Sequence, residues 1–106
     1  MSLSVKEYDI FLPLCYNDGR RIESRKFQDW QAQLLTHFDG LTFFPQANQG
    51  FWKFRDVTYH DEIIILRVIT ADARLARRVL REIKEQLKAD FDQEEILIVE
   101  RDVKTL

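Results

Sequence analysis

Acid–base side chains are densest in one short run of the sequence, Tyr59-His60-Asp61-Glu62. Histidine titrates near neutral pH, so His60 and Glu62 could act as general base and general acid. Glu94 is a third candidate, because a close approach of Glu62 and Glu94 would create a pair of carboxylates. The alternative is a charged, solvated turn and a polar loop, and the sequence leaves open whether the protein is an enzyme.

Five aromatic side chains fall between residues 43 and 54, around a segment rich in glutamine and asparagine. Apolar walls with a few polar groups are the usual design of a small-molecule site. The residues that we expect to line such a pocket are Phe44, Gln49, Trp52 and Glu62. Glu62 would be its polar anchor. Packing in the core or in a subunit interface is the alternative role for these aromatics.

Cationic side chains crowd residues 74–88, which hold six cations and two anions. An anion-binding face on this stretch would comprise Arg74, Arg77, Arg78 and Arg81. It would attract an anionic partner. Nucleic acid is disfavoured as that partner, because no aromatic residues alternate with the cations and no glycine-rich phosphate loop is present. A solvated helix face is the simpler interpretation.

The composition of the chain excludes several classes of protein. A chain of 106 residues predicts one domain over residues 1–106, and a net charge of -2 selects no partner. The single cysteine, Cys15, excludes an intrachain disulfide and fits a reducing cytoplasm. His37 and His60 lack metal-ligand spacing, so we expect no metal and no cofactor. We expect a cytoplasmic protein with no membrane contact, because no signal peptide or spanning segment is visible.

Hydrophobic periodicity predicts four strands and two helices. We expect strands at residues 8–16, 51–57, 62–70 and 96–103, a loop at 45–50 and a turn at 59–61. Ser24 and Asp72 are the expected N-caps of the helices. The first helix should end at Asp39-Gly40, and the second should bury the row Leu75, Val79, Ile83, Leu87 and Phe91.

This β-α-β-β-α-β order predicts a ferredoxin-like α+β sandwich, a four-stranded antiparallel sheet with two helices on one face. Residues 63–66 and 96–99 are nonetheless apolar on both faces. Since two helices can cover only one face, we expect self-association through the open face, as a homodimer or a larger ring. A loop at 41–50 that folds over this face is the alternative. The register is undecided, so the outward residues are too.

Several short motifs resemble those of a bacterial family of small ferredoxin-like domains of unknown function. They are Asp18-Gly19, a helix centred on Trp30, Gly40-Leu41-Thr42, Gly50-Phe51-Trp52, the acidic Glu62 at a strand entry, and Phe91-x-Gln93-Glu94. More broadly, the order of elements is similar to the dimeric α/β-barrel superfamily, in which two such sheets pack face to face. That resemblance implies a dimer that is either a small enzyme or a ligand-binding protein. It implies no catalytic residue.

Overall fold

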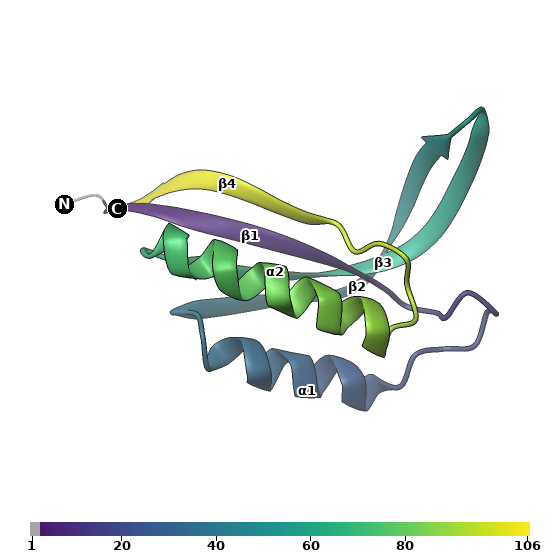
Figure 1. Ribbon diagram of the computed structural model, residues 1–106, viewed down its shortest axis with the longest axis horizontal. Helices are drawn as coiled ribbons and strands as arrows, with labels where there is room; N and C mark the ends of the chain where they lie inside the picture. The colour runs from purple at the N-terminus through teal and green to yellow at the C-terminus, as the bar shows by residue number, and fades with distance from the viewer. Residues whose placement is uncertain (1–2) are drawn as a thin grey trace.

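The computed structural model describes residues 3–106, and its elements follow the predicted order. The strands are β1 (Leu3–Pro13), β2 (Gly40–Phe54), β3 (Val57–Thr70) and β4 (Ile98–Thr105). The helices are α1 (Ser24–Leu35) and α2 (Ala73–Asp90). The strands form one antiparallel sheet in the order β2-β3-β1-β4, and both helices lie on the same side of it (Figure 1). The ferredoxin-like α+β fold is therefore confirmed.

The core lies between the helices and one face of the sheet. Alternate residues of the central strands point into it, because successive side chains of a strand face opposite ways. The buried strand residues are Tyr8, Ile10 and Leu12 of β1 and Ile64, Leu66 and Val68 of β3. The helices contribute Phe27, Trp30 and Leu34 of α1 and Ala76, Leu80, Ile83 and Leu87 of α2. Leu75, expected in the buried row of α2, is 41% exposed because that face is centred on Ala76 and Leu80.

The predicted N-caps differ in outcome. Asp72 caps α2, since its side chain accepts a hydrogen bond from the backbone N–H of Leu75 at 3.1 Å. Ser24 does not cap α1: it is the first helical residue, and Glu23 stands at the cap position without a side-chain hydrogen bond. This helix start is set by packing of Phe27 and Trp30 rather than by a capping side chain.

The predicted loop at residues 45–50 is wrong, because β2 continues through it to Phe54. The pairing of β2 with β3 is irregular only between Phe44 and Asn48. Proline has no N–H to donate to a ladder, and a bulge accommodates Pro45 without ending the strand. A segment held in the sheet cannot fold over the open face, so the alternative of a covering loop is also wrong.

The predicted turn at residues 59–61 is wrong as well. The chain reverses at Arg55 and Asp56, whose φ angles are 50° and 64°. Two residues in the left-handed region form the kind of turn that matches the twist of a β-hairpin. Tyr59 and His60 instead lie within β3, opposite Trp52 and Phe51.

Strands β1 and β4 also differ from their expected bounds. β1 ends at Pro13, and Cys15 forms only an isolated bridge with Arg21. β4 begins at Ile98, two residues later than predicted. Ile96 is buried before the strand begins, and the carbonyl of Leu97 accepts a hydrogen bond from the N–H of Phe11 at 3.0 Å.

Candidate functional site

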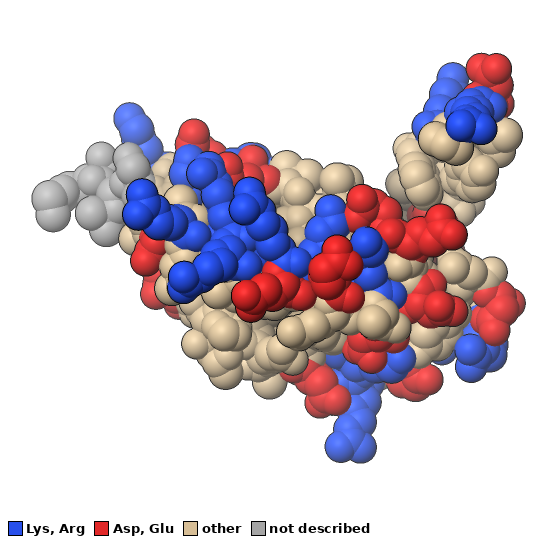
Figure 2. Space-filling view, in the orientation of Figure 1, with Lys and Arg blue, Asp and Glu red and all other residues tan. Residues whose placement is uncertain are grey.

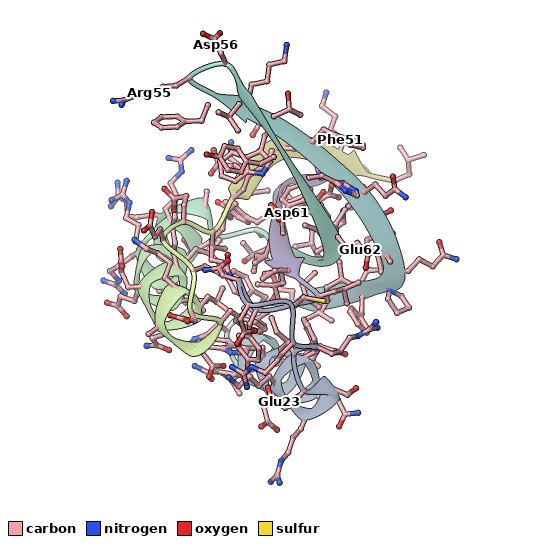
Figure 3. The ribbon with its side chains drawn as sticks, turned by 90° about the vertical axis from the view of Figure 1, so that its right-hand side faces the viewer. Glu23, Phe51, Arg55, Asp56, Asp61 and Glu62 are labelled. Atoms are coloured by element: carbon pink, nitrogen blue, oxygen red, sulfur yellow. The ribbon has the colours of Figure 1, made fainter. Side chains whose placement is uncertain are left out.

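The outer half of the β2–β3 hairpin, residues 48–63, projects from the body of the protein (Figure 1). We call this segment the arm. Figure 3 shows Arg55 and Asp56 at its tip, with Asp61 and Glu62 nearer its base. Large apolar side chains of the arm lie in solvent, namely Phe51, Trp52, Phe54, Val57 and Tyr59, which are 43–65% exposed. An exposed apolar cluster of this kind usually marks a contact surface.

The pairing register divides the side chains of the arm between two faces. Trp52 lies opposite Tyr59 with ring centres 5.4 Å apart, and Phe54 lies opposite Val57 on the same face. The indole Nε1 of Trp52 donates a hydrogen bond to Asp61 at 2.9 Å. This face therefore combines an apolar stripe with one carboxylate.

The other face of the arm carries Phe51 and His60, whose rings stack with centres 4.7 Å apart. Gln49 and Glu62 are paired across the two strands next to them. Imidazole, carboxylate and amide groups thus stand together on this face. It is the more polar of the two, and it holds the acid–base candidates His60 and Glu62.

The face with Trp52 continues the open face of the sheet. Along β3, Ile63 and Ile65 have the same orientation as Tyr59 and Asp61, because residues two apart in a strand share a face. Phe44 and Phe11 flank Ile65 in the register. The arm rises on the side of the sheet that faces away from both helices (Figure 1). We call this shared face, from Phe11 and Ile65 on the sheet to Trp52 and Phe54 on the arm, the apolar corner.

A charged group lies on the open face beside this corner. Asp9 is 4% exposed and accepts hydrogen bonds from Arg67 at 2.8 and 3.1 Å and from Arg101. Arg101 also pairs with Glu7 at 3.2 Å, and Arg67 lies over the ring of Phe44. Burial alone would raise the pKa of Asp9, but the hydrogen bonds from the two arginines outweigh it and hold that pKa below its ordinary value. The two acids and two arginines of this group neutralise one another.

The predicted ligand-binding residues are divided by this geometry. Phe44 and Trp52 belong to the apolar corner, whereas Gln49 and Glu62 lie on the other face of the arm. The carboxylate beside Trp52 belongs to Asp61, which the sequence reasoning did not select. The turn position decides this, because a reversal at Arg55-Asp56 sets which acid shares a face with Trp52.

Glu94 lies in the segment between α2 and β4, and its side chain is exposed. The neighbour of Glu94, Glu95, forms an ion pair with Lys84 at 2.9 Å. A pair of carboxylates built from Glu62 and Glu94 stays a prediction.

The predicted anion-binding arginines lie on the outer surface of α2, and Figure 2 shows Lys and Arg side chains gathered over this helix. All four side chains of the set, Arg74, Arg77, Arg78 and Arg81, are exposed. Arg77 forms a double hydrogen bond with Glu100 of β4, at 2.7 and 2.9 Å. Within the described chain, no ion pair engages the other three. The helix therefore carries uncommitted positive charge beside β4.

Among residues 3–106, no three His, Cys, Asp or Glu side chains come together as ligands for a metal ion. In the same range, no helix has both the length and the apolar character needed to cross a membrane.

Comparison with known proteins gives a likeness of fold. No protein-family model matches the sequence, and no curated protein matches it. Among solved structures, the chain is similar to a phage SAM lyase in complex with S-methyl-5'-thioadenosine. The TM-score is 0.69 at 14% sequence identity, and the match covers 95% of this chain and 88% of that chain. At this identity the likeness extends to the fold alone.

Proposed function

We propose that this protein is a self-associating small-molecule-binding protein whose ligand lies in the apolar corner between the open sheet face and the arm. The observation that carries this proposal is the mainly apolar face that runs from Phe11 and Ile65 to Trp52 and Phe54, with the carboxylate of Asp61 within it. The fold does not need the outer part of this surface, since the arm contributes nothing to the core.

A second copy of the chain is the occupant that fits the open face. Glu7 and Asp9 balance Arg67 and Arg101 within one chain, so two such faces can meet without an unpaired charge. Apolar side chains around the charged group, including Ile65 and Val99, are half-buried and would become covered. Burial of apolar area is the main driving force for such an association.

The chemistry of the corner favours a ligand with a flat ring and a polar or cationic group. Trp52 and Tyr59 offer ring faces, and Asp61 offers a carboxylate whose position is held by the indole of Trp52. The similar phage protein was solved with S-methyl-5'-thioadenosine, a ligand with a flat base and a polar sugar. A nucleoside of this type is the first probe that we propose.

Solution mass tests the assembly. Size-exclusion chromatography with light scattering should give a multiple of 12.7 kDa that persists on dilution. Val57→Asp on the apolar face of the arm and Ile65→Asp on the open face should both lower the mass. Leu35 on α1 is about as exposed as Val57, so Leu35→Asp is the control and should leave the mass unchanged. A monomer at every concentration contradicts self-association.

Neighbouring aromatics on opposite faces of the arm test the ligand site. The thermal shift caused by S-methyl-5'-thioadenosine or SAM should disappear in Trp52→Ala and Asp61→Asn, which alter the corner. Phe51→Ala removes a similarly exposed ring from the other face and should retain the shift. An equal loss in Phe51→Ala and Trp52→Ala would place the ligand elsewhere.

Catalysis on the same class of ligand, bound at the face of the arm opposite the corner, is the second candidate function. It is favoured by the fold likeness to a lyase and by the grouping of His60 and Glu62 on one face of the arm. Incubation with SAM, followed by chromatography for S-methyl-5'-thioadenosine, tests it directly. Formation that is lost in Glu62→Gln or His60→Asn supports an enzyme. Binding without turnover supports a binding protein.

A further inference from the structure

A groove lies between α2 and β4, on the helical side of the sheet and away from the apolar corner. Its volume is about 270 Å³. Tyr8, Leu80 and Ile98 line it with ring and aliphatic surface, and the cations come from α2. Those cations are Arg77, Arg81 and Lys84, and Glu100 of β4 lies across from them. The groove is therefore apolar inside and basic along one rim.

Hydrogen bonds hold one end of this groove. The hydroxyl of Tyr8 donates to Glu100 at 2.7 Å, and the same carboxylate takes both hydrogen bonds from Arg77. Burial, together with the hydrogen bond to Glu100, raises the pKa of Tyr8 to about 12. The phenol therefore keeps its proton and adds no negative charge at neutral pH. Tyr8, Arg77 and Glu100 are thus preorganised before any ligand arrives.

The rim of the groove has more cationic side chains than the neighbouring carboxylates can neutralise. Glu100 engages Arg77, and Lys84 is paired with Glu95 at 2.9 Å. Arg81 forms no ion pair in residues 3–106. One guanidinium group, over an apolar floor and between two other cations, is therefore available for an external anion.

We propose that this groove binds a small organic phosphate. Its phosphate would lie between Arg77 and Arg81, and its apolar part would rest on Leu80 and Ile98. Three cationic side chains against the carboxylates of Glu100 and Glu95 leave the rim with a net positive charge, which suits an anionic phosphate group. The site is narrower than the basic face predicted from the sequence, because Arg74 and Arg78 do not line the groove.

Phenyl phosphate is the probe that tests this site, with binding followed by NMR on the full chain. We expect saturable shifts in the amides around Arg81 of α2 and Ile98 of β4. Arg81→Gln should weaken binding by about tenfold, the effect of losing one charged hydrogen-bond partner. Arg78→Gln, an exposed arginine on the same helix outside the groove, should leave the affinity unchanged. Equal weakening by both substitutions overturns a defined site in favour of diffuse attraction.

A substitution at Glu100 should change the affinity for phenyl phosphate in the opposite direction to Arg81→Gln. Glu100→Gln frees the guanidinium of Arg77 from its carboxylate, so phenyl phosphate should bind more tightly to this variant. Weaker binding would show that Arg77 does not contact the phosphate. Inorganic phosphate should bind more weakly than phenyl phosphate, because it cannot use the floor of Leu80 and Ile98. Equal affinity for the two anions, or equal affinity for phenol, overturns the proposed ligand class.

Discussion

The two halves of the β2–β3 ladder have similar residues and different surroundings. In the inner half, Phe43 pairs with Leu66 and packs toward the helices. In the outer half, Phe54 pairs with Val57 and both are exposed. Aromatic and β-branched residues favour strands in both places, but only the inner half stabilises the monomer. The apolar residues that the monomer leaves in water are the basis of the contact surface proposed above.

Shortening one side chain in each half of the ladder should give the largest difference in the free energy of unfolding. Leu66→Ala removes a fully buried side chain and should lower the free energy of unfolding by about 2–5 kcal/mol. Phe54→Ala on the exposed arm should change the monomer by less than about 0.5 kcal/mol. Urea unfolding at low protein concentration measures both. Similar losses would show that the arm packs within the monomer.

Asp9 in the body and Asp61 on the arm allow the same comparison for charged side chains. Asp9→Ala leaves Arg67 and Arg101 without their buried partner and should cost about 2 kcal/mol, since both arginines still reach water. Asp61→Ala on the arm should cost less than about 1 kcal/mol, because its hydrogen bond to Trp52 is exposed. Urea unfolding of the two variants tests this order. A larger loss from Asp61→Ala would contradict it.

Acid should lower the stability of the body of the protein, because protonation removes the ion pairs of its carboxylates. Hydrogen bonds from Arg77 and Tyr8 lower the pKa of Glu100 from its ordinary 4.5 to about 2. A lowered pKa means that the unfolded chain takes up the proton more readily, so this stabilisation is present above pH 4.5 and is lost as the pH falls toward 2. Thermal unfolding across this range should show a shallower pH dependence in Glu100→Gln. An unchanged slope would show that other carboxylates dominate.

The tip of the arm should give the smallest effect on global stability. Replacement of Arg55-Asp56 by Asn-Gly supplies residues that accept the left-handed conformation more readily. The free energy of unfolding should change by less than about 0.5 kcal/mol, while amide hydrogen exchange within the arm slows. Faster exchange in the arm would contradict a turn at these residues.

Much of the body could be predicted from local pattern. Buried residues recur at spacings of three and four, as with Phe27, Trp30 and Leu34 in α1, and the side chain of Asp72 identifies the start of α2. The candidate site was predicted less well. Pro45 and the Gln/Asn-rich segment favour a loop when considered alone, but cross-strand pairing with β3 holds them in the sheet. Such pairing involves residues distant in sequence, so a local pattern does not report it.

The order of elements, the ferredoxin-like fold and a sheet with one face that no helix covers could all be predicted from the chain alone. These follow from hydrophobic periodicity, which is a property of neighbouring residues. Which side chains share that face depends on the strand register, which is fixed only when the chain folds. The register places Asp61 rather than Glu62 beside Trp52, and it places Glu100 against Tyr8 and Arg77. A slip of one residue reverses every side chain of a strand, so the chemistry of both sites depends on pairings between distant segments.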